Sequence, residues 1–322
     1  MSTDLPSRIG PFKVLDFLGR AGQSAVYRAV DPNQGRTVAL KLFPSHVAED
    51  PATVERFHRE LGAFSLQSRH PNLVEVLGTG QEAERLYLVM EHVNGTSLDR
   101  LLKERRLSVP EAFNVLRGIC RGLAYAHQHG IEHRNLTPRN VLVSSDLSTI
   151  KVGDLVAAGF ESGQSVSGTL STGEIRLSAL YYLAPEQVDG SGKVDHRADV
   201  YSAGVIFHEM LTGRAPGSKF GLPSQLNPEL LPDIDVLVLR CIARRPLERY
   251  TTFLDLLHDL DRLEETLRLR LLTEIRGISQ ASSRLLTVNA ETGQKRNRLP
   301  LYLGLGVLLL AVLAVAGYLI LG

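Results

Sequence analysis

The hydrophobic period of the chain changes once, near Asn94-Gly95, and this change constrains the fold more than any other feature. Before it, short apolar runs bounded by turn residues predict strands at 12–18, 26–30, 37–43, 73–77 and 86–90, with one helix at 51–67. After it, apolar residues at helical spacing predict helices at 98–102, 109–129 and 200–211. The sequence therefore predicts a small β-rich lobe followed by a larger helical lobe.

An uncharged segment lies near the end of the sequence, from Leu299 to Leu321. As a helix it would extend about 34 Å at ~1.5 Å per residue, enough to cross a hydrocarbon core of ~30 Å. Lys295, Arg296 and Arg298 precede it and only Gly322 follows. Positive residues stay on the cytoplasmic side, so we expect a single pass through the cell membrane with the rest of the chain in the cytoplasm. A buried core helix is the alternative interpretation.

Composition narrows the class of protein further. Lys and Arg number 36 and Asp and Glu 35, a balance that predicts no attraction to nucleic acid. Hydrophobic residues make up 43% and charged residues 22%, which excludes a collagen, a disordered chain and a multi-span membrane protein. The two cysteines, Cys120 and Cys241, have no metal-ligand spacing and fit a reducing compartment. Residues 1–10 contain no secretory signal.

An ordered series of short motifs runs along the two predicted lobes. The motifs are Val38-Ala39-Leu40-Lys41, Glu60, Leu88-Val89-Met90-Glu91, the loop His133 to Asn140, Asp154, Ala184-Pro185-Glu186, Asp199 to Gly204, and Arg249. In this order and spacing the chain from about Ile9 to Leu260 resembles the protein kinase family, and within it the bacterial eukaryotic-like Ser/Thr kinases.

The resemblance implies a two-lobed α+β fold and a domain organisation. We expect an N-terminal tail at 1–8 and a kinase-like domain at 9–265, divided into a small lobe (9–92) and a large lobe (93–265). A juxtamembrane linker would follow at 266–298, and a C-terminal transmembrane helix at 299–321.

The resemblance also implies ATP and Mg²⁺ as ligands and assigns a role to each matching residue. The nucleotide-binding positions are Gly19, Val26, Ala39, Lys41, Glu60, Glu91, Val93, Asn140, Leu142 and Asp154. Within this set Lys41 and Glu60 form the expected ion pair, and Asn140 and Asp154 are the metal ligands. The structural positions are Arg134, Glu186, Asp199 and Arg249, with Arg249 expected to pair with Glu186.

Three positions that the family uses for chemistry are changed together. Asn135 stands where the family has its catalytic aspartate, Thr137 where it has a lysine, and Ala179 where it has a threonine. An asparagine cannot act as a base. Losing a general base costs roughly 10²- to 10⁴-fold in rate, or about 3 to 5 kcal/mol of barrier. The glycine-rich loop is also altered, at Ala21 and Ser24.

Two hypotheses about function follow. The first is a membrane-anchored pseudokinase that binds nucleotide and acts as scaffold or regulator of a protein partner, such as another kinase or a membrane protein. The alternative is a working ATP-dependent Ser/Thr protein kinase. Two further questions stay open: whether the Ser/Thr-rich segment 162–172 carries a phosphosite for Arg134, and whether the apolar stripe from Leu256 to Ile275 dimerises.

Overall fold

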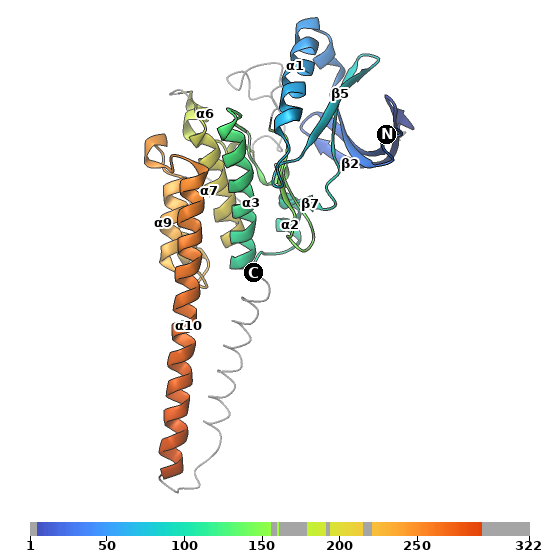
Figure 1. The fold of residues 1–322 in the computed structure, drawn as a ribbon. Helices are drawn as coiled ribbons and strands as arrows, with labels where there is room; N and C mark the ends of the chain where they lie inside the picture. The colour runs from blue at the N-terminus through green and yellow to red at the C-terminus, as the bar shows by residue number, and fades with distance from the viewer. Residues whose placement is uncertain (1–4, 156–159, 161–178, 191–193, 215–220, 292–322) are drawn as a thin grey trace.

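The computed structural model describes residues 5–155, 160, 179–190, 194–214 and 221–291. The first part is a six-stranded antiparallel sheet in the order β1-β2-β3-β4-β6-β5, which Figure 1 shows beside helix α1. The strands are β1 Arg8–Ile9, β2 Phe12–Ala21, β3 Ser24–Val30, β4 Thr37–Leu42, β5 Val76–Glu82 and β6 Arg85–Glu91. A short 3₁₀ helix, η1 Ser45–Ala48, leads into α1.

Helix α1, Pro51–Gln67, is held by its cap and by its buried face. The Asp50 side chain accepts hydrogen bonds from the backbone of Ala52 and Thr53, and Pro51 opens the first turn. Phe57, Leu61 and Phe64 are buried toward the core. The helix therefore lies where the sequence pattern places it.

The second part is mostly helical, with a small sheet in the order β7-β8-β9. Its strands are β7 Thr96–Ser97, β8 Val141–Val143 and β9 Ile150–Val152, and its 3₁₀ helices are η2 Pro138–Asn140 and η3 Pro246–Glu248. Its α-helices are α2 Leu98–Glu104, α3 Val109–Gln128, α6 Pro185–Asp189, α7 Arg197–Thr212, α8 Pro223–Leu226, α9 Pro232–Cys241 and α10 Phe253–Glu291. Helix α3 begins with a capping box between Ser108 and Glu111 and buries a long apolar face.

Helix α10 has 39 residues and extends well past the rest of the large lobe, as Figure 1 shows. Its first half packs on that lobe through the buried residues Leu256, Leu260 and Leu267. Arg117 of α3 is paired with both Asp261 and Glu264 on this half of α10. The expected boundary between domain and linker, at 265–266, falls inside this single helix.

The two-lobed α+β expectation is confirmed, and most predicted elements differ from the observed ones only at their ends. The strand expected at 73–77 begins at Val76, because Leu73 instead forms an isolated bridge with Val152 of the large lobe. Within the residues that the structure describes, no helix is long and apolar enough to cross a membrane. The segment 299–321 lies outside those residues.

Candidate functional site

Strand register brings four predicted residues to one face of the sheet. Val26 of β3 lies opposite both Gly19 of β2 and Lys41 of β4, and residues opposite each other in an antiparallel pair point to the same side. Ala39 is two residues from Lys41 along β4, so it points to that side as well. This face, called here the inner face, therefore carries Gly19, Val26, Ala39 and Lys41 together.

Lys41 on the inner face pairs with Asp154 of the large lobe. The Lys41 Nζ atom lies 2.9 Å from Oδ1 and 3.0 Å from Oδ2 of Asp154. The lysine side chain is 1% exposed and the aspartate side chain 18%. Asp154 has a φ of 62°, a conformation that costs a residue other than glycine of order 1–3 kcal/mol and persists where the surroundings impose it. A buried cation and a strained carboxylate therefore meet between the lobes.

The expected pairing of Lys41 with Glu60 is not made in this structure. Glu60 is exposed on α1, while Phe57 and Leu61 occupy the buried side of that helix. Phe160 is buried against Phe57, with ring centroids 5.2 Å apart. Because apolar contacts fix this orientation of α1, Glu60 remains in solvent and the carboxylate of Asp154 lies against the lysine instead.

Backbone and amide contacts hold the two predicted metal ligands next to each other. The Asn140 side chain donates to the Asn135 carbonyl at 2.9 Å, and the Gly153 backbone N–H donates to the Asn140 carbonyl at 2.8 Å. Asp154 directly follows Gly153. The carboxylate of Asp154 and the amide oxygen of Asn140 are hard oxygen donors, the type that Mg²⁺ prefers. These two residues therefore fit the ion that the family resemblance implies.

The three changed catalytic positions are all described. Asn135 is exposed in the loop before η2, and Thr137 is buried as the residue that precedes η2. Ala179 lies in a helical turn whose carbonyl accepts a hydrogen bond from the backbone of Tyr182. Neither the amide of Asn135 nor the methyl of Ala179 can take up a proton. Leu142 on β8 and Val93 after β6 are both half-buried.

Asp199 at the start of α7 organises the loop that contains Asn135. It accepts hydrogen bonds from the His127 ring at 2.8 Å and from the backbone N–H groups of His133 at 2.8 Å and Arg134 at 2.7 Å. Burial opposes ionisation of this carboxyl, but the hydrogen bond from His127 and the nearby His133 outweigh it, so the pKa of Asp199 is lowered. Arg134 adopts a φ of 59° at this anchor. The structural roles expected of Asp199 and Arg134 fit these contacts.

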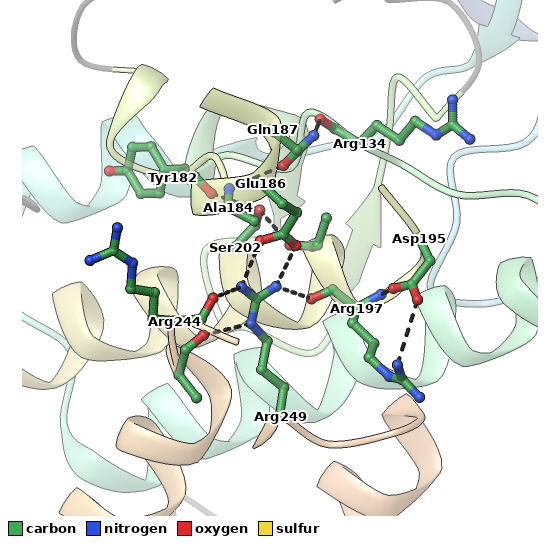
Figure 2. Close-up of polar contacts among 12 residues, drawn as sticks. Arg134, Tyr182, Ala184, Glu186, Gln187, Asp195, Arg197, Ser202, Arg244 and Arg249 are labelled. Carbon is green, nitrogen blue, oxygen red and sulfur yellow. Dashed lines mark hydrogen bonds and ion pairs between the residues drawn. The ribbon is translucent and has the colours of Figure 1, made fainter. Parts of the chain in front are cut away.

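Arg249 and Glu186 form the expected ion pair, drawn in Figure 2. The two guanidinium nitrogens lie 2.7 Å and 2.8 Å from the two carboxylate oxygens, a bidentate geometry. The side chains are 0% and 7% exposed. Arg249 also donates to the carbonyls of Ala243, Arg197 and Arg244. This pair ties the segment that begins α6 to the base of the large lobe.

Sequence reasoning missed Lys151, which links the strand before Asp154 to the connection between the lobes. Its ammonium donates to Glu91 at 2.7 Å and to the Leu73 carbonyl at 3.1 Å. Glu91 also accepts from the Glu75 backbone at 2.8 Å. The side chain of Glu91 is therefore engaged by protein groups. A lysine inside the apolar run 150–152 was the only signal in the sequence for this contact.

The fold and this site define a class of protein: two lobes joined by a short connection, with a buried lysine and an aspartate meeting between them. The family model described as "Protein kinase domain" matches residues 12–259. The chain belongs to the protein kinase family.

Relatives with curated names are bacterial. The chain is 34% identical to "Serine/threonine-protein kinase PknB" of Mycolicibacterium smegmatis, over 79% of this chain and 43% of that protein. It is 32% identical to "Serine/threonine-protein kinase PrkC" of Bacillus subtilis, over 80% of this chain and 42% of that protein. The chain thus spans less than half the length of these relatives.

A solved structure supports the same fold. The kinase domain of PknI from Mycobacterium tuberculosis superposes with a TM-score of 0.63 at 25% identity, covering 79% of this chain and 96% of that domain. The match covers both lobes of a kinase domain.

Proposed function

We propose that this protein is a pseudokinase that binds a nucleotide between its lobes and acts as scaffold or regulator of a protein partner. One observation carries the proposal. The pair Lys41–Asp154 is intact and buried, while Asn135 stands where a base is needed. Binding groups are therefore retained where a group that accepts a proton is lacking.

The binding half of the proposal rests on the inner face. Lys41 offers a buried positive charge suited to phosphate oxygens, and Val26 and Ala39 offer apolar surface suited to a base. Asp154 and Asn140 would hold Mg²⁺, which when bound supplies positive charge to the phosphate groups. These residues explain binding without any chemical step.

The non-catalytic half rests on three further observations. Asn135 carries an amide that cannot accept the proton of a substrate hydroxyl. Glu60 is in solvent, away from Lys41. Between α7 and α9 the described part of the chain contains a single helix of four residues, α8. In the family, a helix in this region is used to dock substrates, and its shortening weakens the case for an ordinary kinase.

The second candidate is an active Ser/Thr protein kinase. It is favoured by the retention of Lys41, Asn140 and Asp154 and by the names of the curated relatives, which are Ser/Thr kinases. The two candidates differ in one measurable property, transfer of phosphate. The purified full chain incubated with labelled ATP, Mg²⁺ or Mn²⁺ and generic protein substrates distinguishes them.

Nucleotide binding is expected to stabilise the folded protein. At a ligand concentration of 100 Kd the gain is ~2.7 kcal/mol, and the melting temperature should rise with ATP in a thermal shift assay. Lys41→Ala should reduce this shift, because it removes the buried charge beside Asp154. Lys103→Ala, at an exposed position on α2, is the control and should keep it. No shift at millimolar ATP, with or without a divalent metal, would contradict the proposal.

We also propose that segment 299–321 anchors the protein in the cell membrane, with the kinase-like domain in the cytoplasm. The support is the absence of charge in the segment and the cluster Lys295, Arg296 and Arg298 before it. The full chain should fractionate with membranes, and a chain ending at residue 298 should become soluble. In spheroplasts, external protease should leave the domain intact. A full chain wholly in the soluble fraction would overturn the anchor.

A further inference from the structure

Ser24 carries a buried hydroxyl that the folded chain does not use. The residue is 0% exposed. Its Oγ atom has no hydrogen-bond partner among the residues that the structure describes. Leaving a buried hydroxyl unpaired costs free energy, so native proteins rarely keep one without a reason. The position of Ser24 in the sheet indicates what that reason is.

Register places Ser24 on the inner face. Ser24 opens β3 and lies opposite Ala21, the last residue of β2, across a turn in which Gly22 has a φ of 61°. Val26, two residues further along β3, lies opposite Lys41. Because side chains alternate along a strand, Ser24 and Val26 point to the same side as Lys41. The unpaired hydroxyl therefore lies on the face that carries the buried ammonium.

Free space adjoins this hydroxyl. A Cβ atom added to Gly19, which lies opposite Val26, would meet no other atom within 4 Å. Gly19 also has a φ of 147°, which a side chain would strain. The strand opposite Ser24 thus leaves room beside the inner face that a ligand can occupy.

We propose that the Ser24 hydroxyl donates a hydrogen bond to the phosphate chain of the bound nucleotide. The inference rests on the nucleotide site proposed above and adds one residue to it. A hydroxyl donor and a phosphate oxygen form a charge-assisted hydrogen bond, with Lys41 supplying the balancing positive charge. The side chain thereby supplies a contact at a position where a glycine would offer only its backbone.

The competing explanation is that Ser24 is only a small residue that fills its place. Under that explanation, removing the hydroxyl changes stability and leaves ligand affinity alone. Under ours, the hydroxyl matters to ligands that carry phosphate and to no others. Adenosine and ATP share the base and the ribose, so comparing them isolates the phosphate chain.

The test measures ATP and adenosine affinity of the full-length protein by calorimetry, for wild type, Ser24→Ala and Thr37→Val. Thr37 is exposed at the far end of the β3–β4 pair, and its variant removes a hydroxyl from the same sheet. Ser24→Ala is expected to weaken ATP binding roughly tenfold, the size of one charge-assisted hydrogen bond, with adenosine binding unchanged. Thr37→Val should bind both ligands as wild type does.

Thermal melting without ligand shows whether the variant is folded. Ser24→Ala should melt at the same temperature as wild type or higher, since it removes an unpaired polar group. Unchanged ATP affinity, or parallel loss of ATP and adenosine binding, overturns the role of Ser24. If wild type binds adenosine and ATP equally well, the phosphate contact is absent and the inference falls while a nucleoside site survives. If wild type binds neither, the proposed function itself fails.

Discussion

The triple variant Asn135→Asp, Thr137→Lys, Ala179→Thr is expected to transfer phosphate at least 10²-fold faster than wild type, with 10⁴-fold as the upper range for a restored general base. Asn135→Asp alone should recover much less. Groups that act as a unit are strongly non-additive, so one restored member leaves the others missing. The measurement is the rate of transfer from labelled ATP to a generic protein substrate.

The structure makes this experiment specific. Asn135 is exposed and its backbone is held by Asn140, so an aspartate there should keep the loop in place. Adding Lys41→Ala to the triple variant is the matched control and should abolish the gain. A wild-type rate of ~1 to 100 per second, that of an ordinary kinase, would contradict the pseudokinase proposal. A triple variant without activity would assign the defect to Glu60 and the orientation of α1.

Arg249→Ala is expected to lower the free energy of unfolding by about 3–5 kcal/mol. The substitution removes one partner of a bidentate pair and leaves the Glu186 carboxylate buried without a counter-charge. It also removes the donor to three carbonyls of the large lobe. Denaturant titration followed by circular dichroism measures the loss.

Two controls separate burial from charge. Arg245→Ala breaks an exposed pair with Glu248, whose side chains are 82% and 55% exposed, and should cost under about 1 kcal/mol. The double variant Arg249→Met, Glu186→Leu removes both charges and should be less destabilised than Arg249→Ala alone. A single variant as stable as Arg245→Ala would show that the buried pair contributes little.

Elements with a clear period were predictable, and the exceptions have physical causes. Helix α9 was not predicted because Ile234, Val236 and Val238 alternate with other residues as in a strand. In the fold, Ile234 and Val238 are buried a helical turn apart while Val236 is exposed. Packing against the large lobe therefore decides the conformation that the local pattern left ambiguous.

The site was predictable where a residue acts through its identity, and less so where it acts through a distant partner. Motif spacing identified Lys41, Asp154 and the Glu186–Arg249 pair. It assigned Lys41 to Glu60, because spacing along α1 does not show how the helix is turned about its axis. The contacts of Lys151 and the unpaired state of Ser24 depend on segments far apart in the chain, which no local pattern encodes.

The length of α10 sets a scale for the reach of this protein. Among the described residues, its last contact with the lobe is the ion pair of Arg270 with Asp233. The helix continues to Glu291, a further rise of about 32 Å at ~1.5 Å per residue, comparable to the thickness of a bilayer core. Whatever holds the far end of this rod therefore fixes the radius within which the lobes can meet a partner. Shortening or lengthening the rod by whole turns would change that radius in steps of ~5.4 Å without altering the site.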